Sequence, residues 1–241
     1  MNKLSTVVEA KRMMKRNKLF TIGILISGIL SIVLGVVTFY GQQAGNFVMN
    51  VDYDAFNRGI VIANNRTMEN AGPQLYSQAV QDAKDVTYRW LDISSADETD
   101  GNFYDPDLKY VAYTFYVQNV GSETVDMLYS MRITDVYKDL DEAIRVIIID
   151  NGEETIYQKP DEADEFGVLP TYPTSMPLTT PFIDEDTVVR RIIPSFSPNE
   201  IRKFTIIIWL EGEDPDTNDD VLGGQIKFRM TFSIEDEDVL A

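Results

Sequence analysis

The chain has 241 residues and a net charge of −18, and it contains neither cysteine nor histidine. The missing cysteines exclude disulfides, thiol nucleophiles and iron–sulfur clusters, and the missing histidines exclude imidazole metal ligands and Ser-His or Cys-His nucleophile pairs. Because the first 18 residues hold six basic side chains and one acidic side chain, the remainder has a net charge of −23, which would repel a nucleic acid.

An uncharged apolar stretch follows the basic N-terminus, over residues 19–40. A helix of this length would span about 33 Å, which matches a bilayer core of roughly 30 Å. We therefore predict a basic tail over 1–18, a transmembrane helix over 19–41 and an outer domain over 42–241. Since positive charge marks the cytoplasmic flank, the tail is expected in the cytoplasm, the helix in the plasma membrane and the domain outside the cell. A cleaved signal peptide is the alternative.

Beyond this stretch, short apolar runs with strand-like spacing are separated by turn residues. The expected strands are Asn46–Tyr53, Gly59–Ala63, Asp85–Ile93, Leu108–Asn119, Val125–Val136, Ala143–Asp150, Glu154–Gln158, Val188–Ile193, Lys203–Leu210 and Gly224–Ile234. Apolar and polar side chains alternate over Gln225–Ile234, which is typical of a half-buried strand. Phe204–Trp209 is apolar almost throughout, which indicates a strand that is buried on both faces.

Two connections carry hairpin signals. Gly121 lies between the fourth and fifth expected strands, which we predict to pair with each other. Asn151 and Gly152 lie between two apolar stretches and form the strongest short hairpin signal in the chain.

Three segments depart from the strand pattern. Gly72–Lys84 has apolar residues at helical spacing and predicts a helix, and Lys138–Glu142 predicts a short turn. Residues 160–187 contain five prolines and little periodicity, so we expect a long exposed excursion or a linker between two smaller units. Many short strands without long helices predict a mainly β fold, as an antiparallel β-sandwich or jelly roll.

The loop over 211–220 (EGEDPDTNDD) gathers carboxylates directly after a predicted strand. Ca²⁺ takes about six to eight oxygen ligands, and the candidate ligands here are Asp214, Asp216, Asn218 and Asp220. An EF-hand is excluded because the glycine that its loop requires is missing. We favour a solvated acidic turn, because a segment rich in proline and aspartate after a strand needs no metal to explain it, and keep a Ca²⁺ loop as the alternative. No cofactor other than this Ca²⁺ is expected.

Weaker candidates lie elsewhere in the chain. The segment Asp97–Asp105 is a second acidic cluster, and no spacing singles out a carboxylate pair for glycoside hydrolysis. Leu169-Pro170-Thr171 is similar to the start of a sortase signal but lacks the rest of it. Aromatic residues could form a platform for sugars or peptides, or pack in the core: Trp90, Tyr104, Tyr110, Tyr113 and Tyr116.

Four stretches resemble known proteins: residues 45–62, 110–126, 140–153 and 204–228. The last reads FTIIIWLEGEDPDTNDDVLGGQIKF. They resemble a group of anchored surface proteins of Gram-positive bacteria that share a WLEGxDPxC motif and look like distant relatives of the TasA/camelysin β-sandwich proteins, which build extracellular fibres. The chain differs at Thr217, where the motif has cysteine. Camelysin-like relatives are sometimes labelled metalloproteases, an activity that we do not extend to a chain without histidine.

These features predict a non-enzymatic, membrane-anchored surface protein. Residues 19–41 would anchor the chain in its first partner, the lipid bilayer. The β-sandwich would contact protein partners, other copies of the chain or the cell wall. Two alternatives stay open. One is a subunit of a TasA-like or pilin-like fibre, in which Asn46–Tyr53 would complete a neighbour's sheet. The other is a Ca²⁺-dependent carbohydrate-binding module.

Overall fold

The computed structural model describes residues 22–31, 46–163, 166–173 and 176–235. The chain divides into two compact units, Met1–Gln43 and Ala44–Ala241. In the first unit, residues 22–31 form a helix with exposed apolar side chains. Among the described residues, no helix has both the length and the apolar character needed to cross a bilayer. The predicted tail over 1–18 and most of the predicted span over 19–41 lie outside the described residues, so both stay predictions.

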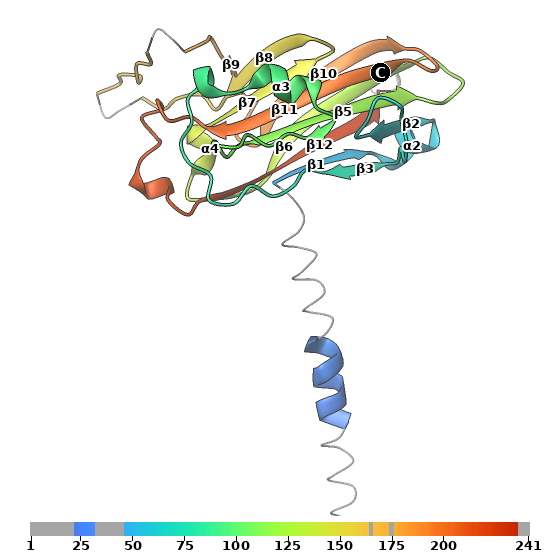
Figure 1. The fold of residues 1–241 in the computed structure, drawn as a ribbon, viewed down its shortest axis with the longest axis horizontal. Coiled ribbons are helices and arrows are strands. Elements are labelled where there is room, and N and C mark those ends of the chain that lie inside the picture. Colours follow the sequence, from blue (N-terminus) through green and yellow to red (C-terminus); the bar gives the residue numbers. More distant parts are fainter. Residues whose placement is uncertain (1–21, 32–45, 164–165, 174–175, 236–241) are drawn as a thin grey trace, which may run out of the picture. The chain divides into compact units, whose positions relative to one another are not determined.

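The second unit is mainly β and contains two mixed sheets (Figure 1). The five-stranded sheet has the order β10 (Thr187–Phe196), β6 (Val125–Tyr137), β12 (Gln225–Ile234), β1 (Phe47–Val51) and β3 (Gln74–Tyr76). Its neighbours are antiparallel except β1 and β12, which run parallel with Phe47 beside Phe228. The expectation of purely antiparallel sheets is therefore wrong. These two strands lie at opposite ends of the domain sequence, and no hairpin forces them to be antiparallel.

The seven-stranded sheet provides the other layer. Its order is β2 (Ile60–Ala63), β5 (Val111–Asn119), β11 (Ile201–Leu210), β7 (Ile144–Asp150), β8 (Glu153–Gln158) and β9 (Thr180–Pro181), with β4 (Gly101–Asn102) also beside β5. Its pairs are antiparallel except β8 and β9. The predicted turn at Asn151 and Gly152 joins β7 to β8, and both residues have positive φ, which confirms the predicted hairpin.

One hydrophobic core lies between the two sheets. Phe204 of β11 is fully buried at its centre, with its ring 5.5 Å from that of Phe115 in the same sheet. Across the core it lies 5.2 Å from the ring of Tyr129 and 5.4 Å from that of Phe232, both in the five-stranded sheet. The predicted alternation of β12 is confirmed, because Ile226, Phe228, Met230 and Phe232 are buried there.

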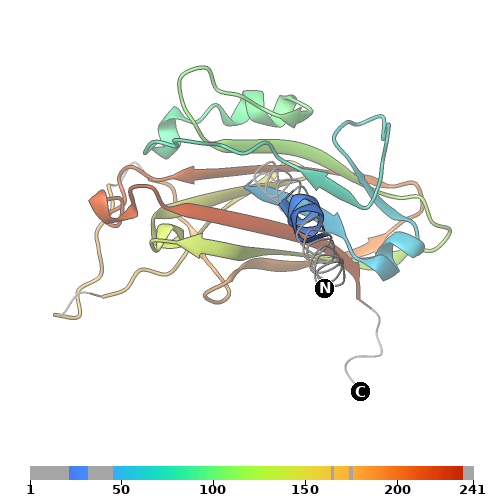
Figure 2. The ribbon, with the colours of Figure 1, turned by 90° about the horizontal axis from the view of Figure 1, so that it is seen from below.

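The seven-stranded sheet is also covered on its outer face (Figure 2). The covering segment contains a 3-10 helix, η1 (Tyr88–Trp90), and the helix α3 (Ile93–Glu98), which contacts β5 and β11. Ile207 and Trp209 of β11 pack against it in a second apolar cluster. The prediction that this strand is buried on both faces is confirmed, and the covering segment is the reason.

The predicted pairing across Gly121 is wrong. The strands on either side of it, β5 and β6, belong to different sheets and face each other across the core. Gly121 serves a different purpose: a Cβ at this position would lie 2.2 Å from the carbonyl oxygen of Arg58. A glycine is needed because two backbones approach closely, and it also marks where the chain changes sheet.

Two further predicted elements differ from the structure. Instead of a helix, Gly72–Lys84 contains the strand β3, because pairing of Leu75 with Met49 extends the sheet beside β1 and outweighs the local helical pattern. Instead of a strand, Asp85–Ile93 contains η1 and only a single bridge, between Val86 and Glu211.

Short helices complete the unit. The first is α2 (Tyr53–Asn57), which Asp52 caps by accepting a hydrogen bond from the amide of Ala55 at 2.7 Å. The others are α4 (Leu140–Ala143), which overlaps the predicted short turn over Lys138–Glu142, and the 3-10 helix η2 (Asp219–Val221). Within its described parts, the stretch 160–187 has only β9 before the start of β10, as expected of a long excursion.

Candidate functional site

The acidic loop after β11 begins with a carboxylate that organises the loop itself. Glu211 is fully buried. Its Oε2 accepts hydrogen bonds from the indole nitrogen of Trp209 at 3.0 Å and from the amide of Tyr88 at 3.2 Å, and its Oε1 accepts one from the amide of Glu213 at 3.0 Å. Thr217, at the position of the motif's cysteine, donates through its hydroxyl to the carbonyl oxygen of Glu211 at 2.6 Å. These contacts fix the course of the loop.

Next in the loop, Asp214 forms a buried ion pair with Arg145 of β7. Arg145 is 1% exposed and Asp214 is 4% exposed. Arg145 donates through Nη2 to Asp214 Oδ2, and through Nη1 to the carbonyl oxygens of Ile144 at 3.2 Å and Glu142 at 3.4 Å. Such a pair is stabilising only when further hydrogen bonds compensate the loss of water. The two carbonyls supply part of this compensation, whereas Arg145 Nε is buried without a hydrogen-bond partner among the described residues. Burial accordingly raises the pKa of Asp214, although the charge of Arg145 opposes the rise.

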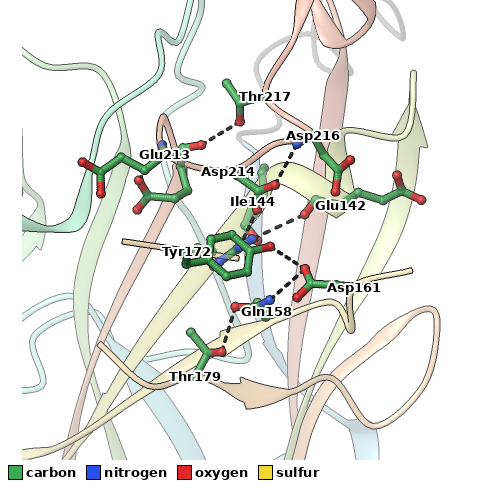
Figure 3. A network of polar contacts seen from close by, with 12 residues as sticks. Glu142, Ile144, Gln158, Asp161, Tyr172, Thr179, Glu213, Asp214, Asp216 and Thr217 are labelled. Atoms are coloured by element: carbon green, nitrogen blue, oxygen red, sulfur yellow. Dashed lines mark hydrogen bonds and ion pairs between the residues drawn. The ribbon is translucent and has the colours of Figure 1, made fainter. Parts of the chain in front are cut away.

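An outer layer of polar contacts ties the proline-rich excursion to this ion pair (Figure 3). The ring of Tyr172 lies 5.5 Å from the guanidinium of Arg145, and its hydroxyl donates to Asp161 Oδ1. Gln158 of β8 donates to the same oxygen at 3.2 Å and accepts from the hydroxyl of Thr179 at 2.7 Å. Burial and the hydrogen bond to Asp161 raise the pKa of Tyr172, so this hydroxyl stays a donor.

A pocket of about 490 Å³ adjoins this network. One part of its lining is apolar, formed by proline, alanine and the aliphatic side chains of Val168 and Leu169. Among the described residues, the charged part holds four carboxylates and one cation. The described residues of the lining are Glu142, Lys159, Pro160, Asp161, Glu162, Ala163, Val168, Leu169, Pro170, Thr171, Pro215 and Asp216.

The single cation of the lining is already paired. Lys159 Nζ lies 2.7 Å from Asp141 Oδ2 and 3.8 Å from Glu142 Oε1. Partial burial lowers the pKa of Lys159, but the hydrogen bond and the charges of these two carboxylates outweigh it and raise that pKa overall. Burial raises the pKa of Glu142; Lys159 opposes the rise, and the nearby charge of Asp216 adds to it. Negative charge is therefore in excess in the pocket.

The four predicted calcium ligands do not converge. Asp214 is engaged with Arg145, and Asp216 lines the pocket. Asn218 accepts through Oδ1 from the amide of Asp220 at 2.8 Å and so caps η2, while Asp220 is exposed. In the part of the chain that the structure describes, no group of three or more acidic side chains is placed to hold a metal ion. The calcium site stays a prediction.

The other candidates are also dispersed. In Asp97–Asp105, Asp97 forms an ion pair with Lys203 at 2.8 Å, and Asp100 accepts from the hydroxyl of Tyr116 at 2.7 Å. Of the five aromatic residues proposed as a platform, Tyr110, Tyr113 and Tyr116 are buried, whereas Trp90 and Tyr104 are exposed. The sortase-like stretch Leu169-Pro170-Thr171 lines the pocket.

Sequence reasoning missed Arg145 and Tyr172. The signal for Arg145 was present, because it is the only charge in the otherwise apolar run AIRVIII. A charged side chain in a buried strand requires a partner of opposite sign. Tyr172 lies in a segment without periodicity, so no pattern pointed to it.

Comparisons with known proteins add little to this geometry. No protein-family model matches the chain, and no curated protein matches it significantly. Among solved structures, a β-glucosidase from Kluyveromyces marxianus in complex with glucose is similar at 12% identity with a TM-score of 0.28. The selenomethionine-labelled form of that enzyme is similar at 14% identity with a TM-score of 0.26. Each comparison covers 82% of this chain but only 18% and 19% of the respective enzyme chains.

Proposed function

We propose that this chain is a non-enzymatic, membrane-anchored surface protein whose β domain binds a partner outside the cell. The observation that carries the proposal is the pocket lined by Glu142 of α4, by Lys159 and the proline-rich excursion after β8, and by the acidic loop. The pocket combines an apolar wall with an excess of negative charge among the described residues. The buried ion pair of Arg145 and Asp214 adjoins it, because the amide of Asp216 donates to Asp214. A concave site with an apolar lining and a few fixed polar groups is the usual form of a binding site.

The anchoring part of the proposal rests on the basic N-terminus and the apolar stretch after it. Within that stretch, the helix over residues 22–31 exposes Ile24, Leu25 and Ile29. Exposed aliphatic side chains around a helix favour a lipid surrounding over water. The anchor would hold the domain at a defined orientation and raise its local concentration at the cell surface.

We infer further that the two sheets form a β-sandwich of the jelly-roll class. The chain changes sheet repeatedly, for example between β5 and β6, between β10 and β11 and between β11 and β12. Such crossings between two facing sheets are typical of jelly rolls. β1 lies between β12 and β3 of its own chain, so a fibre built by strand exchange would require this strand to leave its place.

Membrane extraction of the full chain in a bacterial host tests the anchor. We expect the chain to stay in the membrane pellet after high-salt washing and to be released by detergent. Protease added outside the cytoplasmic membrane should remove the domain and leave a protected N-terminal fragment. The variant Leu25→Lys/Ile29→Lys should lose the membrane association, because each charge at the centre of a membrane helix costs about 2.5–3.5 kcal/mol.

The matched control is Leu25→Val/Ile29→Leu, which keeps the stretch apolar and should behave like the wild type. A product that begins near Gly45 and is found in the medium or in filaments would contradict the proposal. So would a lysine variant that is retained in the membrane as firmly as the control.

A further inference from the structure

We infer that the pocket binds the basic side chain, lysine or arginine, of a partner polypeptide. The inference rests on the proposed binding function and names the chemistry of the partner. Of the residues that the structure describes, four carboxylates line the pocket, from Glu142, Asp161, Glu162 and Asp216, against one cation, that of Lys159. Because Lys159 is already held by Asp141 and Glu142, it does not neutralise the other carboxylates.

Two of the four carboxylates lack an ion-pair partner in the part of the chain that the structure describes. Within the described ranges, no ion pair involves Glu162 or Asp216. Asp216 is close enough to Glu142 for its charge to raise the pKa of Glu142, so the two carboxylates repel each other. A cation placed between them would remove this repulsion, which makes a basic group complementary to the site.

The apolar part of the lining selects the kind of cation. Val168, Leu169 and Pro170 lie in the same lining as the carboxylates. Lysine and arginine carry a charged head on an aliphatic stem, and they bury the stem against apolar surface while the head reaches polar groups. The combination therefore fits a basic side chain on a polypeptide.

The buried network fixes the carboxylate of Asp161 and the backbone of Asp216 in advance. The amide of Asp216 donates to Asp214 Oδ1 at 2.9 Å, and the hydroxyl of Tyr172 donates to Asp161. Arg145 joins these two contacts, since it pairs with Asp214 and lies against the ring of Tyr172. A frame of this kind lowers the entropic cost of binding, because the Asp161 carboxylate and the loop backbone at Asp216 do not have to be ordered by the ligand.

The test uses the full chain in a non-ionic detergent micelle and a fluorescein-labelled pentapeptide with a central lysine between two leucines. Binding is followed by fluorescence anisotropy. We expect saturable binding that weakens with added salt, that is retained when arginine replaces the lysine, and that is lost when the lysine is Nε-acetylated. Equal binding of the acetylated peptide would overturn the inference.

Two matched double variants locate the site. Glu162→Gln/Asp216→Asn removes two charges of the pocket and should weaken peptide binding about tenfold, as expected for two partly screened ion pairs. Asp219→Asn/Asp220→Asn removes the same amount of charge from the same acidic loop, but outside the pocket lining. It should change peptide binding less than about twofold, because salt screens charges that do not contact the peptide. Equal effects of the two variants would overturn the inference.

The outcomes separate this inference from the proposed function. Membrane retention without binding of either basic peptide would overturn the inference and leave the anchored surface protein in place. Binding of the lysine peptide by a chain that fails the membrane extraction would support the pocket and overturn the anchor.

Discussion

Arg145 is the residue on which the candidate site depends most. It lies in β7 among isoleucine and valine residues and is 1% exposed. Its guanidinium connects a strand, the acidic loop and the excursion through Ile144, Asp214 and Tyr172. A single buried charge thus joins three segments that are far apart in the sequence.

Removing one member of this ion pair should be more damaging than removing both. Arg145→Met leaves the carboxylate of Asp214 buried without a partner, and Asp214→Leu does the same to the guanidinium. Each single variant should lose about 3–5 kcal/mol of the free energy of unfolding, and the double variant should lose less than either. Urea denaturation of the full chain in non-ionic detergent measures this. A double variant that loses the sum of the two single losses would show that the residues do not act as a pair.

Tyr116 should make the domain sensitive to alkaline pH. Burial, followed by the hydrogen bond to Asp100, raises its pKa from 10.0 to about 12. Above pH 10 the unfolded chain releases this proton while the folded chain retains it, so the free energy of unfolding falls as the pH rises from 10 to 12. Tyr116→Phe should reduce that slope by up to about 1.4 kcal/mol per pH unit.

Denaturation curves between pH 9 and 12 test this expectation. Tyr53→Phe is the matched control, because Tyr53 is 84% exposed and the substitution removes the same hydroxyl. If the free energy of unfolding of Tyr116→Phe fell with pH as steeply as that of the wild type, the Tyr116 hydroxyl would not be the source of the pH dependence.

At the scale of elements, two glycines in connections have opposite roles. Gly152 has a φ of +92° in the turn between β7 and β8, with no atom within 4 Å of an added Cβ. Gly121 lies between β5 and β6, where an added Cβ would meet the backbone of Arg58 at 2.2 Å. Gly152 is required because the backbone has a positive φ, and Gly121 is required because there is no space for a Cβ.

Alanine at these two positions should therefore differ in effect. Gly152→Ala should cost about 1–2 kcal/mol of the free energy of unfolding, the expense of a left-handed conformation for a residue with a Cβ. Gly121→Ala should cost more, because two backbones must separate where the chain crosses between the sheets. Thermal and urea denaturation of both variants compare the two losses. A smaller loss for Gly121→Ala would contradict the close approach.

The whole molecule is divided by charge. The first 18 residues are basic, and the rest of the chain has a net charge of −23. Repulsion among like charges destabilises a compact domain and keeps the domain away from anionic surfaces. In the pocket the same negative charge is concentrated, so it would attract a basic side chain. The membrane-extraction and protease experiment tests whether the basic N-terminus and the acidic domain lie on opposite sides of a bilayer.

Local patterns were sufficient for several features of the fold. The alternation of β12, the continuous burial of β11 and the turn at Asn151 and Gly152 all follow from residues that are neighbours in the sequence. Gly72–Lys84 shows the limit of such patterns, because pairing with β1 outweighed a helical spacing. Pairing energy is supplied by the partner strand, and a local window does not contain the partner.

By itself, the sequence determined the mainly β class, the faces that its strands bury, the charge division and the chemistry that a chain without histidine and cysteine excludes. Only the tertiary structure decided that β5 and β6 lie in different sheets, that β1 runs parallel to β12 and that Arg145 meets Asp214. The pocket belongs to the second group. Periodicity records whether a side chain is buried, but which segment buries it depends on how the sheets close around one core.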